Sequence, residues 1–276
     1  MKKYLLLSSQ KNKTDQSSSL EEISNYYEKV EKFDEADFIL ILGGDGSLNY
    51  FVNHYFDDLE RKSKGVIYFP CGTANDFAKS LKISEDLVLG KSLVESILRG
   101  SKKISVPIMR CNEKKFINVA SFGAPAEVTD SGDSALKEVT GKVSYYLNAF
   151  NQMFLEDSFN IKVNNKHEIK DVRGFLISQG LFVGGGIKAT TSLVANLKDH
   201  FNFLTTKAKG FLESVGSLME VSNGNLSEDT KIVSKFYTEA NFKTNKEINV
   251  KLDGEVYKGS EFKIDKSKVL VHFYAY

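Results

Sequence analysis

The sequence predicts an α/β N-terminal domain with a parallel sheet and helices, followed by a mainly antiparallel β domain. In the first part of the chain, apolar runs typical of buried strands alternate with segments of helical periodicity. In the second part, apolar and polar residues alternate with a period of two around Asn-Asn and Asp-Gly turn signals. A chain of 276 residues is long enough for two domains. We place the boundary near Lys103, which gives an α/β domain over 1–103 and a β-rich domain over 104–276.

The N-terminal elements follow from short local patterns. The apolar run from Tyr4 to Leu7 is too short for a secretory signal and predicts a first strand. A serine-rich polar loop over 8–19 follows, and a helix is expected from Leu20 to about Lys32.

Two strand-turn-helix units come next. The sequence predicts buried strands over 36–42 and 65–70, and helices from about Ser47 to Leu59, after "GTAND", and from Asp86 to Arg99. Gly100 is the expected C-cap of the last helix.

The second half is expected to contain mainly strands. Two strands are predicted around the polar turn at Asn112-Glu113, and a helix over 145–155. The segments 160–178 and 248–276 predict hairpins, the second with Asp253-Gly254 as its turn.

Composition excludes some classes of function. The chain has 37 Lys and Arg against 36 Asp and Glu, so its net charge of +1 gives no electrostatic reason to expect nucleic acid. Its two cysteines, Cys71 and Cys111, have no metal-type spacing and favour a cytoplasmic location. Because the apolar stretches are too short to span a bilayer, contact with a membrane is expected to be peripheral, on its inner face.

Two glycine-containing turns are the candidates for a phosphate site. "GGDGSLN" (43–49) and "GTAND" (72–76) each follow a predicted strand, so both should lie at the carboxyl edge of the parallel sheet. Glycine lets another group approach the backbone, and the N-terminus of the next helix attracts an anion. The hydroxyls of Ser47 and Thr73 and the amides of Asn49 and Asn75 could add hydrogen bonds.

The carboxylates in these turns have two interpretations. Phosphate alone would repel Asp45 and Asp76, whereas Mg²⁺ bound to phosphate would attract them. Alternatively, each aspartate caps its helix. Neither a P-loop nor a dinucleotide fingerprint is present, because the required lysine and glycine spacing are missing.

The two motifs together resemble the diacylglycerol kinase catalytic domain family, which includes bacterial lipid kinases and sphingosine kinases. That family is marked by GGDGT-x-N followed by GT-x-ND-F-A, and here the motifs read "GGDGSLN" and "PCGTANDFAKSL". The blocks "FINVASFGAPAEV" (116–128), "GLFVGGGIKA" (180–189) and "LDGE" (252–255) follow in the family's order. NAD kinases share the GGDG turn but lack the second block.

The resemblance implies a lipid kinase that binds ATP and Mg²⁺ and transfers the γ-phosphoryl group to a lipid hydroxyl. It implies that 1–103 is a nucleotide-binding domain, shortened at its N-terminal part, and that 104–276 is the lipid-substrate domain. It implies Asp45 and Asp76 near the metal, and Asp45 and Glu255 as catalytic residues, with Glu255 accepting the proton of the hydroxyl. Without the family, Glu255 reads as a solvent-facing residue of a hairpin. The positions implied to bind the nucleotide are Gly43, Gly44, Asp45, Gly46, Ser47, Leu48, Asn49, Gly72, Thr73, Asn75 and Asp76.

The chain departs from the family in four places. The loop over 8–19 lacks the Asn-Pro and glycine turn that helps to hold the nucleotide, and a second strand and helix before "GGDG" look missing or heavily cut. Pro107 stands near the position of an expected aspartate, and only Asp199 remains of an acidic block that holds a structural Mg²⁺.

Three hypotheses follow from these observations. The first is an active lipid kinase that works at a membrane surface on a diacylglycerol-like or sphingoid substrate, with a homodimer left open. The second is a pseudokinase that binds lipid or nucleotide without transferring phosphate. The third is a small-molecule kinase related to NAD kinases. Retention of Asp45, Asp76 and Glu255 favours the first hypothesis, and the shortened N-terminal part favours the second.

Overall fold

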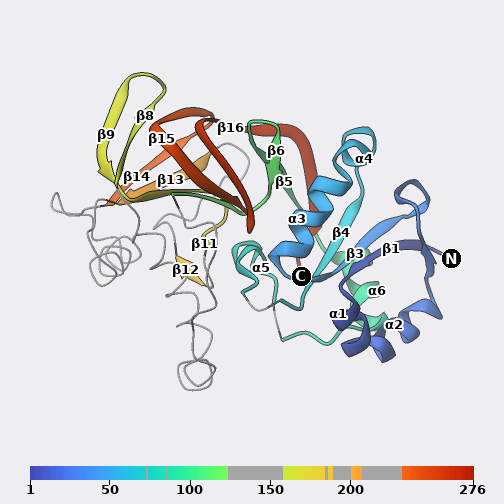
Figure 1. Ribbon diagram of the computed structural model, residues 1–276. Coiled ribbons are helices and arrows are strands. Elements are labelled where there is room, and N and C mark those ends of the chain that lie inside the picture. The colour runs from blue at the N-terminus through green and yellow to red at the C-terminus, as the bar shows by residue number, and fades with distance from the viewer. Residues whose placement is uncertain (73, 85, 124–157, 184–185, 189–199, 207–231) are drawn as a thin grey trace, which may run out of the picture. The chain divides into compact units, whose positions relative to one another are not determined.

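The computed structural model describes two compact units (Figure 1). Unit 1 comprises Met1–Ile108 and Ser267–Tyr276, and unit 2 comprises Met109–Lys266. The described residues are 1–72, 74–84, 86–123, 158–183, 186–188, 200–206 and 232–276. Unit 1 thus differs from the predicted domain over 1–103, because the end of the chain returns to it as a strand of its sheet.

Unit 1 is built on a parallel sheet in the order β2-β1-β3-β4-β16, in which only the end of β16 takes part. Every residue of β3 and β4 is buried, as expected for strands that are covered on both faces. At the end of β16, His272 pairs with Gly65 at the start of β4. The strands that lie wholly or partly in unit 1 are β1 (Lys3–Ser8), β2 (Glu28–Val30), β3 (Phe38–Gly43), β4 (Gly65–Pro70), β5 (Lys103–Cys111), which is not part of this parallel order, and β16 (Glu255–Tyr274).

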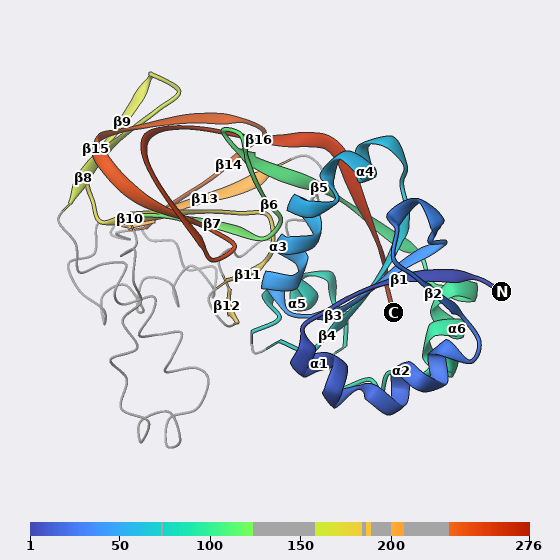
Figure 2. The ribbon, with the colours of Figure 1, turned by 45° about the vertical axis from the view of Figure 1, so that its right-hand side comes forward.

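Helices cover both faces of this sheet (Figure 2). On one face, Ile23 of α2 and Val94 and Ile97 of α6 pack in a core with alternate residues of β3 and β4. On the other face lies α3, whose Leu48 and Phe51 are buried. The helices are α1 (Gln10–Asp15), α2 (Ser17–Ser24), the 3-10 helix η1 (Phe33–Glu35), α3 (Asp45–His54), α4 (Phe56–Arg61), α5 (Asp76–Leu81) and α6 (Lys91–Gly100).

The N-terminal segment differs most from the sequence prediction. The stretch over 8–19, predicted as a loop, forms α1 and the start of α2, with Ser9 capping α1. The helix predicted to run to Lys32 ends at Ser24, and the chain then forms β2, parallel to β1. Since β2 has three residues and the three-residue 3-10 helix η1 is the only element between β2 and β3, the expected strand-and-helix unit is heavily cut rather than missing. Ile23, Tyr27 and Val30 have helical spacing and are all buried, but Val30 is buried as part of a strand.

Two other predicted helices differ from the structure in their bounds. The helix expected over 47–59 is divided at Tyr55 into α3 and α4. The helix expected from Asp86 begins at Lys91, after an extended Gly90, and Gly100 is its last residue rather than its C-cap. The helix predicted over 145–155 lies outside the described residues.

Unit 2 is antiparallel, as predicted, with β15 and the first part of β16 forming a long hairpin. Asp253 and Gly254 form its turn with φ of 47° and 109°, which suits the Asp-Gly pair. Aromatic rings fill the core, and those of Phe122 and Phe175 stack 4.1 Å apart. The remaining strands are β6 (Lys114–Phe116), β7 (Val119–Phe122), β8 (Phe159–Val163), β9 (His167–Val172), β10 (Gly174–Ser178), β11 (Phe182–Val183), β12 (Ile187–Lys188), β13 (Phe201–Thr206), β14 (Ile232–Tyr237) and β15 (Ala240–Leu252).

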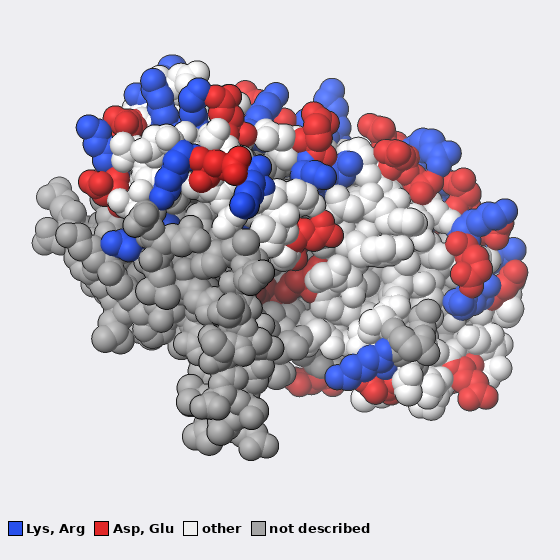
Figure 3. All heavy atoms as spheres, in the orientation of Figure 1, with Lys and Arg blue, Asp and Glu red and all other residues white. Residues whose placement is uncertain are grey.

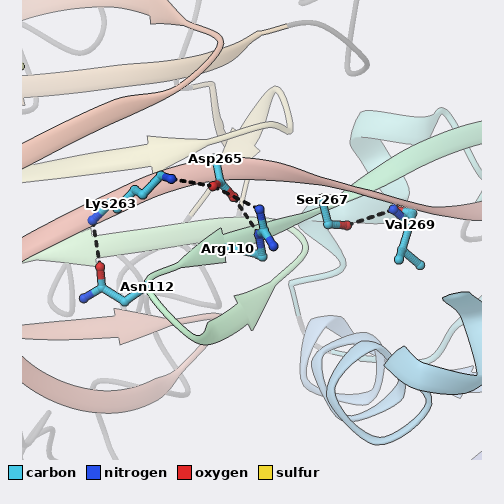
Figure 4. Close-up of polar contacts among 6 residues, drawn as sticks. All are labelled: Arg110, Asn112, Lys263, Asp265, Ser267 and Val269. Atoms are coloured by element: carbon cyan, nitrogen blue, oxygen red, sulfur yellow. Dashed lines mark hydrogen bonds and ion pairs between the residues drawn. The ribbon is translucent and has the colours of Figure 1, made fainter.

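Polar contacts fasten the turn between β5 and β6 to β16 (Figure 4). The backbone N–H of Lys263 donates to Asn112 Oδ1 at 2.8 Å, and Asn112 Nδ2 donates to the carbonyl of Glu261 at 3.1 Å. Arg110 makes a two-point contact with Asp265, with Nε 2.7 Å from Oδ1. The short hairpin thereby gains a fixed register against the long one.

Acidic and basic side chains are mixed over the strands of unit 2 in the view of Figure 3. Examples are the ion pairs of Lys243 with Glu261 and of Lys170 with Glu168, whose side chains are all exposed. Exposed pairs of this kind contribute little to folding free energy, so the aromatic core carries the stability of this unit.

Candidate functional site

The two glycine turns lie against each other at the carboxyl edge of the sheet of unit 1. Gly43 and Pro70 are paired at the ends of β3 and β4, and Cys71 N donates to Gly43 O at 3.0 Å. A Cβ atom on Gly72 would lie 2.5 Å from the Cα atom of Gly44, and one on Gly44 would lie 3.0 Å from the Cα atom of Gly72. Only glycine permits this approach, so the two motifs form one structure.

Asn75 fixes the second turn from within. Its side-chain amide pairs with the peptide groups of Gly72: Gly72 N donates to Oδ1 at 2.9 Å, and Nδ2 donates to Gly72 O at 2.9 Å. Asn75 adopts a left-handed conformation with φ of 50°, which asparagine tolerates better than most residues do. This amide therefore has a structural role that the sequence prediction of a nucleotide contact did not include.

Asp45 joins the two motifs. Its Oδ2 accepts a hydrogen bond from the backbone N–H of Asp76, and its Oδ1 accepts one from Phe77 N, both at 3.1 Å. These are the first backbone N–H groups of α5, so Asp45 caps the helix of the other turn rather than its own. Its own helix, α3, has Gly44 at the N-cap, without a side-chain hydrogen bond.

Gly46 has room for a ligand. A Cβ atom at Gly46 would meet no atom of the described residues within 4 Å outside the helix backbone, whereas one at Gly43 would lie 1.9 Å from Ser47 Oγ. Ser47 N and Leu48 N both donate to Gly44 O. The positive end of the α3 dipole lies next to the open space at Gly46 and would attract an anion there.

Other positions expected to bind the nucleotide have their side chains in the interior. Leu48 is fully buried, so only its backbone could contact a ligand. Asn49 is also buried, and its backbone and side-chain oxygens accept hydrogen bonds from Asn53 Nδ2 at 3.0 and 3.3 Å. Thr73 lies outside the described residues, as do Asp199 and the glycines 184–185.

Asp45 and Asp76 are compatible with a Mg²⁺ ion that is also bound by phosphate. A carboxylate offers about four acceptor positions, and two of those on Asp45 receive N–H groups. Asp76 lies beside it and is 3% exposed. The described residues contain no cluster of three or more His, Cys, Asp or Glu that could hold a metal ion. One or two carboxylates with phosphate oxygens is a common Mg²⁺ arrangement, so the predicted metal role remains a prediction.

A cavity of about 390 Å³ lies at the same edge of unit 1. Its volume falls in the range of small-molecule pockets. The sequence did not reveal it, because its polar wall is formed by α1, in the stretch predicted as a loop. Burial raises the pKa of the Cys71 thiol at its edge, with a smaller contribution from the charge of Asp15. The cavity is lined by Asn12, Asp15, Gln16, Phe69, Pro70, Cys71, Leu87, Val88 and Leu89.

Unit 2 carries the other predicted catalytic residue. Glu255 is exposed at the start of β16, and Tyr257 Oη donates to its Oε2 at 2.5 Å. The neighbouring Asp253 accepts hydrogen bonds from the backbone N–H groups of Ile117, Asn118 and Val119 at 2.7, 3.1 and 2.8 Å. The hairpin turn is thus tied to the start of β7. Pro107, near the position of the expected aspartate, is part of β5.

None of the described helices is long and apolar enough to cross a membrane.

Comparisons with known proteins agree with this architecture. The family model described as "Diacylglycerol kinase catalytic domain" matches residues 5–109. A diacylglycerol kinase of Staphylococcus saprophyticus is 28% identical over 222 residues, covering 79% of this chain and 70% of the relative. One of Staphylococcus epidermidis is 27% identical over 224 residues, covering 80% of this chain and 68% of the relative.

Solved structures share the fold. A protein from Bacillus anthracis superposes with a TM-score of 0.71 at 18% identity, over 100% of this chain and 95% of that one. A structure named as a diacylglycerol kinase from the same organism superposes with a TM-score of 0.64 at 15% identity, over 100% and 97% of the two chains. These superpositions establish similarity of fold, including the α/β and antiparallel β architecture.

Proposed function

We propose that this chain is an ATP-dependent lipid kinase of the diacylglycerol kinase catalytic domain family, whose model matches residues 5–109. The relatives' names support a lipid kinase in general terms, and the proposal adds ATP as donor and a diacylglycerol-like or sphingoid alcohol as acceptor. The observation that carries it is the pair of fused glycine turns with open space at Gly46.

The phosphate groups of ATP would lie at the start of α3. The N–H groups of this first turn and the positive end of the helix dipole attract anions, and Gly46 leaves space for an oxygen close to the backbone. Asp45 and Asp76 would hold Mg²⁺, which neutralises charge on the transferred phosphoryl group. Asp45 would then have two roles, because it also caps α5.

Glu255 would accept the proton of the lipid hydroxyl. In this step, the hydroxyl oxygen forms a bond to the γ-phosphorus while the bond from that phosphorus to the bridging oxygen of ADP breaks. The hydroxyl proton passes to the Glu255 carboxylate, and the products are a phosphorylated lipid and ADP. An exposed carboxylate on unit 2 is accessible to an acceptor, which supports this role.

The pseudokinase remains the alternative proposal. It is favoured by the short N-terminal unit, in which β2 has three residues and η1 takes the place of a helix, and it is disfavoured by the retention of Asp45, Asp76 and Glu255. Because the proposed acceptor is a lipid, we place the protein at the inner membrane surface during turnover.

The direct test is transfer of labelled phosphate from Mg²⁺-ATP to mixed-micelle lipids, with NAD as a control acceptor. The lipids are diacylglycerol, monoacylglycerol, sphingosine, ceramide and phosphatidylglycerol. A labelled lipid that disappears in Glu255→Gln is expected. Labelled NADP without labelled lipid would instead support a small-molecule kinase. Binding of Mg²⁺-ATP without any labelled product would support the pseudokinase hypothesis.

A further inference from the structure

Glu255 and Tyr257 form a pair on one face of β16. They are two residues apart on a strand, so their side chains point to the same side of the sheet. The hydroxyl of Tyr257 donates to Oε2 of Glu255 at 2.5 Å, a short distance that is typical of a hydrogen bond to a charged carboxylate.

The ring of Tyr257 is anchored on two sides. Tyr257 pairs with Val250 of β15, and its ring packs against the aromatic core of unit 2. The ammonium group of Lys114 lies 4.8 Å from the ring centroid, within the range of a cation–π contact. A tyrosine side chain has only two side-chain torsions, so these contacts fix the position of its hydroxyl.

The carboxylate of Glu255 has to be held in one orientation if it is to accept a proton from the substrate. An exposed glutamate side chain loses rotamer freedom when it is fixed in one geometry, and this loss opposes the ordering. The hydrogen bond from Tyr257 offsets this cost before the substrate arrives. It engages Oε2, and a carboxylate has enough acceptor positions to receive a substrate hydroxyl as well.

We propose that Tyr257 is a positioning residue, which holds the Glu255 carboxylate in the orientation that accepts the proton of the acceptor hydroxyl. This inference rests on the proposed lipid kinase function. It explains why a tyrosine whose ring belongs to the core presents its hydroxyl at the start of β16. The arrangement follows the general logic of a catalytic base oriented by a third group.

The kinetic test compares Tyr257→Phe with Tyr237→Phe. Tyr237 also packs against the core of unit 2, so its variant controls for loss of a phenol hydroxyl at this core. We expect Tyr257→Phe to lower kcat about 3–10-fold with KM for ATP unchanged, since an exposed charged hydrogen bond is worth roughly 1 kcal/mol. Tyr237→Phe is expected to keep the wild-type kcat.

Glu255→Gln separates failure of this inference from failure of the proposed function. If Glu255→Gln is inactive and Tyr257→Phe has the wild-type kcat, the positioning role is overturned and the kinase remains. If Glu255→Gln is fully active, Glu255 is not the proton acceptor and the positioning role falls with it, while the lipid kinase activity stands; absence of transfer by the wild-type protein would overturn the proposed function itself. A fall in kcat for Tyr257→Phe equal to that for Tyr237→Phe would also overturn the positioning role.

A titration tests the contact without activity. Burial raises the pKa of Tyr257 to about 12, and the hydrogen bond and charge of Glu255 add to this shift. In Glu255→Gln the charge is removed, while Lys114 remains over the ring. The pKa of Tyr257, followed by NMR of its ring carbons, should therefore fall below the wild-type value. An unchanged pKa would show that Glu255 is not held by this hydroxyl.

Discussion

The carboxylate of Asp45 accepts the backbone N–H groups of Asp76 and Phe77 at 3.1 Å, so a residue of the first glycine turn caps the helix that follows the second. The contact of Gly44 with Gly72 and the amide pairing of Asn75 with Gly72 lie next to this bridge. The two sequence motifs are therefore coupled in stability.

We predict that Asp45→Ala destabilises the protein. The variant leaves two N–H groups of α5 without their acceptor, which should lower the free energy of unfolding by about 1–2 kcal/mol. Asp45→Asn keeps one acceptor oxygen, so its free energy of unfolding should fall by less than that of Asp45→Ala. Urea unfolding followed by circular dichroism measures both. A wild-type midpoint for Asp45→Ala would show that the bridge contributes nothing to stability.

We predict that the side chain of Asn75 contributes more to the free energy of unfolding than its backbone conformation does. Asn75→Gly suits φ of 50° but removes both hydrogen bonds to Gly72, so it should cost about 1–2 kcal/mol. Lys82 has φ of 60° at the other end of α5, and Lys82→Gly is the matched control. The control should unfold at or slightly above the wild-type urea concentration. Equal stability of the two variants would argue against the role of the amide.

The two cysteines should differ in reactivity. Burial raises the pKa of Cys111 to about 12, and its thiol is 4% exposed, so almost no thiolate is present at neutral pH. Cys71 is partly exposed, and its pKa is raised less strongly. Iodoacetamide at pH 8 should modify Cys71 first, as mass spectrometry can determine, and should modify Cys111 only after urea is added. Labelling of Cys111 in the native protein at the rate found in urea would contradict its burial.

Much of the fold could be predicted from local patterns. The strand at 65–70 has the predicted bounds, because both of its faces are buried and the apolar run marks its ends. The Asp253-Gly254 turn was identifiable because few residue pairs adopt two positive φ values easily. By contrast, β2 has three residues, too few to show a period, and its neighbours Ile23 and Tyr27 have helical spacing.

The internal connections of the candidate site could not be predicted. Asp45 and Asp76 are 31 residues apart, and nothing in the sequence shows which helix the first one caps. The sequence predicts that the glycines let phosphate approach the backbone, yet Gly44 and Gly72 are needed for backbone packing, and of these three glycines only Gly46 has space that the described residues leave open. Such roles depend on tertiary contacts, which local sequence patterns do not encode.

The most direct test of the account is the binding of Mg²⁺-ATP to Gly46→Ala, measured by calorimetry together with thermal unfolding. Alanine is favoured over glycine in a helix by up to about 1 kcal/mol, so this variant should melt at or above the wild-type temperature. Its added Cβ fills the open space at the start of α3, so binding should weaken at least about tenfold, or roughly 1.4 kcal/mol. Gly72→Ala, whose Cβ would lie 2.5 Å from the Cα atom of Gly44, should instead lose stability. Wild-type affinity for Mg²⁺-ATP in a stable Gly46→Ala protein would contradict the proposed phosphate site.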